Sequence, residues 1–130
     1  MTTVTKTPVT YLATVSGAAG SSKASPGANS GWIDTGSNSA NAADGGDMGL
    51  SITNGSSAPG VAPTILLQWS PDNGATVYDY QAFGGDTIAS SINTTTVWVD
   101  PGMRYLRVIG YGNTTNAVTF GATFSGVTRA

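Results

Sequence analysis

Apolar residues recur at every second position over several short stretches of this chain, as in β-strands that bury one face. The alternation is clearest at residues 48–53, where Met48, Leu50 and Ile52 share one face. No long stretch repeats apolar residues with helical spacing, and glycine and β-branched residues, which disfavour helix, are scattered throughout. The pattern predicts eight strands: residues 9–15, 31–35, 48–53, 64–70, 76–82, 95–99, 103–111 and 117–125.

Seven or eight short strands separated by turns rich in glycine, proline and asparagine predict an all-β fold, an antiparallel β-sandwich of jelly-roll type. Residues 103–111 are apolar on both faces, which indicates a central strand or a strand whose second face is covered. The large core residues are predicted to be Leu67, Trp69, Trp98, Phe120 and Phe124.

The length of 130 residues suits one domain, predicted to span residues 9–130. Residues 1–8 are predicted to form an extended N-terminal arm, because Pro8 interrupts regular pairing and no strong apolar set anchors the segment. The small-residue link at 16–30 is predicted to be a loop or a second mobile segment. We expect the arm to bind a neighbouring subunit by strand addition.

Charged residues make up only 9% of the chain, whereas Ser, Thr, Gly and Asn together account for 59 of its 130 residues. Such a surface can pack against a neighbour without desolvating charge, which favours a subunit of an assembly. The net charge of −2 gives no electrostatic footprint for nucleic acid or for an anionic membrane. The chain has no apolar run of signal-peptide or membrane-spanning length, so no membrane partner is expected.

The sequence predicts no enzyme, no cofactor and no metal site. It contains no histidine and no cysteine, and all seven acidic residues are aspartates. The usual general base, the commonest metal ligand and thiolate chemistry are therefore excluded. No aspartate lies in a recognisable catalytic motif, so catalytic, cofactor-binding and metal-binding residues are all predicted to be none.

Several stretches nevertheless hold polar or aromatic groups that could bind a ligand. In "SPDNGATVY", each of Pro71, Asp72, Asn73 and Gly74 has a role in a turn, so Asp72 is interpreted as a turn residue. The "DGGD" loop at Asp44–Asp47 could contribute to a calcium site with Asn38 or Asn41. Arg104 and Arg107 are interpreted as strand residues that pair with aspartates or make interface contacts. Trp32, Tyr78 and Tyr80 could form a sugar platform, or belong to the core or an interface.

Three segments together resemble small β-sandwich structural proteins of tailed bacteriophages: "ILLQWSPDNGATVYDY", "VDPGMRYLRVIGY" and "AVTFGATFSGVTR". In those proteins a strand ending in S-x-D-G-x-x-W/Y is followed by a P-x-x-R-Y-x-R-V strand and a closing alternating strand. The first motif is matched here by Ser70, Asp72, Gly74 and Tyr78, with Asn73 lengthening the turn. The second is matched by Pro101, Arg104, Tyr105, Arg107 and Val108. The resemblance covers residues 64–128.

The resemblance implies a virion structural protein, most simply a decoration or cement subunit on the outer surface of the capsid. Its partners would then be the major capsid protein lattice and copies of itself in a homo-oligomer. A tail or baseplate component is the alternative within the same class. A carbohydrate- or surface-binding β module is the alternative outside it.

Overall fold

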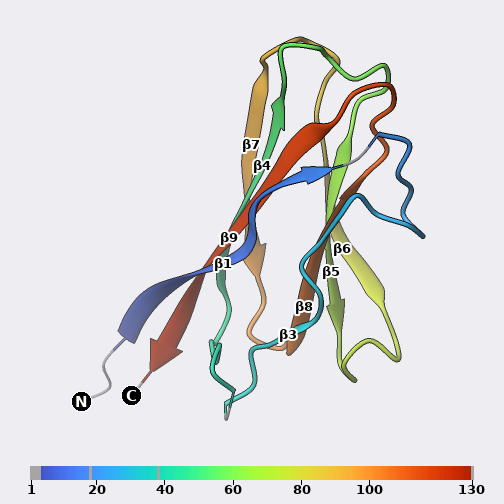
Figure 1. The fold of residues 1–130 in the computed structure, drawn as a ribbon. Helices are drawn as coiled ribbons and strands as arrows, with labels where there is room; N and C mark the ends of the chain where they lie inside the picture. The colour runs from blue at the N-terminus through green and yellow to red at the C-terminus, as the bar shows by residue number, and fades with distance from the viewer. Residues whose placement is uncertain (1–3, 18, 38, 130) are drawn as a thin grey trace.

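Two antiparallel β-sheets pack face to face in the computed structural model, which describes residues 4–17, 19–37 and 39–129 (Figure 1). The first sheet has the strand order β1-β9-β4-β7, and the second has the order β2-β8-β5-β6, with β3 also paired to β8. The strands are β1 (Val4–Gly17), β2 (Ala28–Asn29), β3 (Ile33–Asp34), β4 (Gly46–Asn54), β5 (Thr64–Ser70), β6 (Tyr78–Gly84), β7 (Ile92–Val99), β8 (Tyr105–Tyr111) and β9 (Val118–Arg129).

The strand order is that of a jelly roll. β2 and β3 pair with opposite ends of β8, so together they occupy one edge position and the sandwich has eight positions. The predicted all-β sandwich is confirmed, and no helix occurs among the described residues. Accordingly, the described part of the chain contains no helix long and apolar enough to cross a membrane.

The core lies between the sheets and is built by the predicted alternation. Met48, Leu50 and Ile52 of β4 are buried, and so are the inward residues of β9, Val118, Phe120, Ala122 and Phe124. On β8, Leu106 and Val108 face this core. Of the five large core residues predicted, Leu67, Phe120 and Phe124 are buried, and Trp69 is half-buried against the same cluster.

The prediction that Trp98 is a core residue is wrong, because its side chain is 52% exposed. Alternate residues of β7 face opposite sides of the sheet, and Val97 and Val99 are the ones that face the core. Trp98 therefore faces solvent on the outer side of the first sheet. The alternation in "TVWV" allows either Trp98 or its two valine neighbours to face the core. The prediction chose Trp98 because it is larger and strongly hydrophobic, and this choice was wrong.

The prediction that Pro8 prevents regular pairing is also wrong. Residues 4–8 belong to β1, and they lie opposite residues 125–129 of β9 with Pro8 across from Ser125. β1 is an edge strand, where a proline can stand without removing a bond that the sheet needs. The described part of the predicted arm is thus continuous with the sandwich, and residues 1–3 lie outside the described residues. Figure 1 shows the start of β1 beside the end of β9.

The link between β1 and β2 crosses the outer face of the second sheet. Lys23 in this link pairs with Asp79 on β6, whereas Ala28, five residues later, lies beside β8. β5 and β8 separate these two places in the sheet, so the link spans both strands. This explains why Ile109, on the outer side of β8, is fully buried. The second face of the 103–111 strand is therefore covered, as its apolar pattern indicated.

A matched pair of glycine substitutions tests the packing between the sheets. A Cβ at Gly110 would lie 2.5 Å from the ring of the fully buried Phe120, whereas a Cβ at Gly84 would meet nothing within 4 Å. Gly110→Ala should lower the free energy of unfolding by about 1–3 kcal/mol because a rigid ring must move. Gly84→Ala should change it by about 0.5 kcal/mol or less. Urea denaturation measures both, and equal effects would contradict this account of the core.

Candidate functional site

The outer face of the second sheet is occupied by a chain of polar contacts that holds the 19–32 segment in place. The Arg107 guanidinium donates to Gln68 Oε1 at 2.9 and 2.6 Å, and Gln68 Nε2 donates to Asp79 Oδ1 at 2.8 Å. Asp79 in turn accepts from Lys23. The other end of the chain is Trp32, whose ring lies 4.5 Å from the Arg107 guanidinium carbon.

The polar groups of this network are bonded to one another, so we assign the network a structural role. Gln68 is only 2% exposed, and both ends of its amide are used. Lys23, followed by Gln68, holds the pKa of Asp79 below its usual value, so the carboxylate is stabilised in its charged form. Burial lowers the pKa of Arg107. The groups satisfy one another, and the 19–32 segment that they hold covers part of this face.

The outer face of the first sheet is open by contrast, and it is our candidate functional surface. We call it the threonine face. Registration of β4 with β7 and β9 places its residues in rows across the sheet. The rows are Ser125–Asp47–Trp98, Thr123–Gly49–Thr96, Gly121–Ser51–Thr94 and Thr119–Thr53–Ile92.

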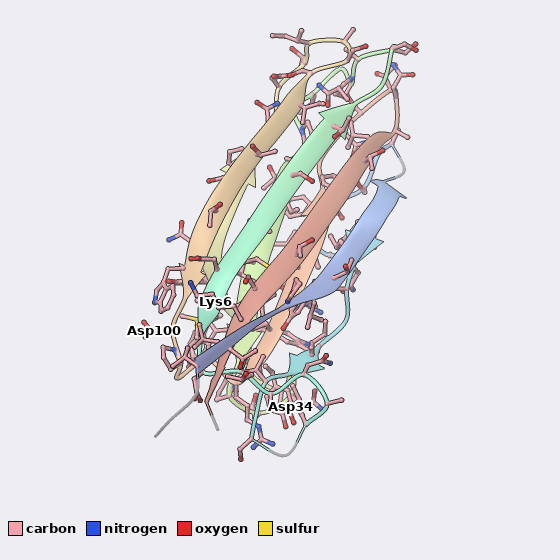
Figure 2. All side chains as sticks on the ribbon, turned by 90° about the vertical axis from the view of Figure 1, so that its left-hand side faces the viewer. Lys6, Asp34 and Asp100 are labelled. Atoms are coloured by element: carbon pink, nitrogen blue, oxygen red, sulfur yellow. The ribbon has the colours of Figure 1, made fainter. Side chains whose placement is uncertain are left out.

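The side chains of the threonine face are small and mostly uncharged, so they project little from the sheet. Gly49, Ser51 and Gly121 form the floor of a shallow depression of about 580 Å³, with Thr94, Thr96 and Thr123 among the residues around it. Among these rows, Asp47 carries the only charge. Figure 2 looks onto this face, and the labelled Lys6, on the edge strand β1, and Asp100, just beyond β7, lie at its margins. A protein surface could dock here without desolvating charged groups.

Sequence reasoning found only part of the threonine face. With Phe120 and Phe124 predicted in the core, alternation along the predicted strand 117–125 turns Thr119, Gly121, Thr123 and Ser125 outward, and the structure places them there. Their neighbours on β7 were missed for two reasons. The predicted strand began at Thr95 whereas the structure begins it at Ile92, and the prediction of Trp98 as a core residue turned this face of the strand inward. The signal available was the β-branched run "INTTTVWV", whose even-numbered positions all face outward.

The interpretation of Asp72 as a turn residue is confirmed. Its carboxylate accepts from the Thr76 amide at 2.6 Å, from the Thr76 hydroxyl at 2.8 Å and from the Ser70 hydroxyl at 2.8 Å. Asn73 and Gly74 have φ values of 56° and 95°, as the turn requires. The Thr76 bonds, first among these contacts, hold the pKa of Asp72 below its usual value. The carboxylate is committed to the loop.

The Asp44–Asp47 loop is shaped by its two glycines. A Cβ at Gly45 or Gly46 would lie 2.6 and 2.2 Å from the backbone oxygens of Val99 and Ser125, so only glycine lets the loop pass this close. Asp47 projects from β4 onto the threonine face. No group of three or more acidic, histidine or cysteine side chains converges anywhere in the described residues. Asn38, one of the side chains considered for a calcium site, lies outside them.

Arg104 pairs with an aspartate, as predicted. Its guanidinium donates to both carboxylate oxygens of Asp34, at 3.0 and 3.2 Å, and holds the pKa of that carboxyl below its usual value. The pair borders an open polar hollow of about 470 Å³ that also contains Ser37, Ser39 and Asp44. Within this hollow, the charges of Arg104 and Asp34 neutralise each other.

The three aromatic residues considered for a sugar platform are engaged in separate contacts. Trp32 stacks on Arg107, and Tyr78 stacks on Trp69 with 4.9 Å between ring centroids. The Tyr80 hydroxyl donates to the backbone oxygen of Trp98 at 2.8 Å and so links the two sheets. The exposed aromatic ring on the threonine face is instead that of Trp98.

Two glutamine substitutions test the polar network. Gln68→Ala leaves Arg107 without its acceptor, so we expect a loss of about 1–3 kcal/mol in the free energy of unfolding. Gln81→Ala changes an exposed glutamine on the neighbouring strand β6 and should be nearly neutral. Thermal or chemical denaturation distinguishes them. If the two variants were equally stable, the network would not be holding the 19–32 segment.

Comparisons with known proteins add a weak likeness to a solved structure. No family model matches the chain, and no curated protein matches it. Among solved structures, a chain described as "Family 16 Carbohydrate Binding Module-2" is similar over 68% of this chain and 62% of its own length. The TM-score is 0.39 and the sequence identity is 14%.

Proposed function

We propose that this protein is a structural protein of a bacteriophage virion, a decoration subunit that binds the outer surface of the capsid lattice. The observation that carries the proposal is the threonine face: a broad, open sheet surface with few charges, on a sandwich whose other outer face is partly covered by the 19–32 segment. Such a surface loses little solvation energy when it docks on a regular protein array. We choose the phage capsid as the array because segments within residues 64–128 resemble structural proteins of tailed bacteriophages.

The threonine face suits a protein partner better than a small-molecule substrate. Its depression is shallow, and the polar side chains around that depression are Ser and Thr hydroxyls rather than titratable groups. Ser and Thr hydroxyls both donate and accept hydrogen bonds, so they can pair with either kind of group on the lattice. Side chains of this size also lose little rotamer entropy on docking. A tail or baseplate surface would use the same face in the same way.

Co-sedimentation with capsids that lack the protein tests the proposal. The intact chain should pellet with such capsids, and Thr123→Lys should weaken binding by about tenfold or more because a charge is buried in the middle of the threonine face. Gln81→Lys introduces the same charge on the other sheet and should bind like the intact chain.

Three results would count against the decoration role. Pelleting with purified tails but not with heads would move the protein to the tail. Equal binding by Thr123→Lys and Gln81→Lys would remove the threonine face from the interface. Binding to immobilised glycans, with loss on Trp98→Ala and none to particles, would favour a carbohydrate-binding module, since Trp98 is the exposed aromatic side chain of this face.

A further inference from the structure

The outer edge of β7 differs from the other strand edges in the described part of the chain. Proteins usually block free edges with charges, prolines, bulges or very short strands. β1 carries Lys6, Pro8 and two register shifts, and β6 carries Asp79 and a register shift. β2 and β3 are two residues long. β7 has eight residues with no charge, proline or glycine.

β7 also runs in unbroken register with β4, from Val99 opposite Gly46 to Ile92 opposite Thr53. Figure 2 shows it as one edge of the sheet. The amide of Asn54 donates to the Ser91 oxygen at 2.8 Å, so the odd-numbered residues turn their backbone groups toward β4. The even-numbered residues therefore turn theirs to the free edge: Ile92, Thr94, Thr96 and Trp98.

The Tyr80 hydroxyl occupies one of these outward groups, since it donates to the Trp98 oxygen at 2.8 Å. This contact agrees with the outward direction of the even-numbered carbonyls. It does not close the edge, because a carbonyl oxygen has two lone pairs and can accept a second hydrogen bond.

The large exposed side chains of β7 are arranged symmetrically. Ile92 is 68% exposed and Trp98 is 52% exposed, and both project from the same side of the sheet. Each lies three residues from Thr95, in opposite directions along the strand. A strand with this arrangement is complementary to an antiparallel copy of itself.

We propose that β7 pairs with β7 of a second copy of this chain about a two-fold axis through Thr95. Ile92 then lies opposite Trp98 of the second copy, and Thr94 lies opposite Thr96. All four are outward-facing residues with free backbone groups, so each of these pairs can exchange two hydrogen bonds. The two four-stranded sheets become one continuous sheet.

A second copy fits this edge because the contact is isologous, and both apolar pairs form at once by symmetry. β7 carries no charge that would repel its own copy, and Asp100, just beyond the strand, lies opposite Ser90 in this register. The pairing does not depend on any capsid, so it stands or falls separately from the proposed lattice role. It also leaves the centre of the threonine face open.

Single cysteines in this cysteine-free chain test the register. Thr95 meets its own copy in a non-hydrogen-bonded pair, where Cα atoms are about 4.5 Å apart, within the disulfide range of about 4.4–6.8 Å. Positions 94 and 96 are offset from their own copies by two residues, so their Cα separations are about 8 Å. Under mild oxidation, Thr95→Cys should form a reducible dimer at least about tenfold faster than Thr94→Cys or Thr96→Cys.

If cross-linking came only from random collisions, Thr94→Cys and Thr96→Cys should react faster than Thr95→Cys, because Thr94 and Thr96 are more exposed than Thr95. Equal rates for the three variants, or a faster rate at Thr94 or Thr96, would overturn this register. Sedimentation velocity without oxidant gives a second readout. Thr96→Lys should shift the protein to monomer, whereas Thr123→Lys, with the same charge two strands from the edge, should dimerise like the parent chain. A parent chain that stays monomeric throughout a concentration series would overturn the pairing itself.

Discussion

The contact between the ring of Phe120 and the backbone of Gly110 sets the separation of the two sheets. Phe120 lies on β9 and Gly110 on β8, and both strands are interior to their sheets. Because glycine presents no Cβ, the ring lies directly against the β8 backbone and the two sheets approach closely at this point. The flanking inward residues, among them Val108 and Ala122, then fill the space between the sheets.

Each sheet also has an outer face. A segment of the chain covers part of this face on the second sheet, whereas the outer face of the first sheet is exposed to water. On the second sheet, burying Ile109 requires a cover, which the 19–32 segment supplies. The cover costs conformational entropy, and its contacts with Asp79 and Arg107 offset that cost. On the first sheet, the outward residues are small and polar, so the face is stable in water without a cover and remains available to a partner.

The two edge strands of the first sheet, β1 and β7, also differ in how they are protected from further pairing. β1 combines a lysine, a proline and two register shifts, all of which discourage pairing with a further strand. β7 lacks these features and exposes Ile92 and Trp98 in water. A chain with so few charges would be at risk of uncontrolled edge pairing unless such an edge were used in a defined contact. A two-fold pairing of β7 closes the edge, whereas a head-to-tail contact would continue into a fibre.

The sequence by itself determined the fold class, most strand positions and the roles of individual turns. Period-2 alternation needs no tertiary information, so the inward faces of β4 and β9 and the turn at Asp72 followed directly from local chemistry. Tertiary structure alone decided which outward residues share a surface. Gly49, Thr96 and Thr123 are far apart in the chain, and only strand order and register bring them into one row. It also decided that Trp98 faces water and that Pro8 is tolerated, because a linear pattern specifies neither which side of β7 meets the core nor that β1 is an edge strand.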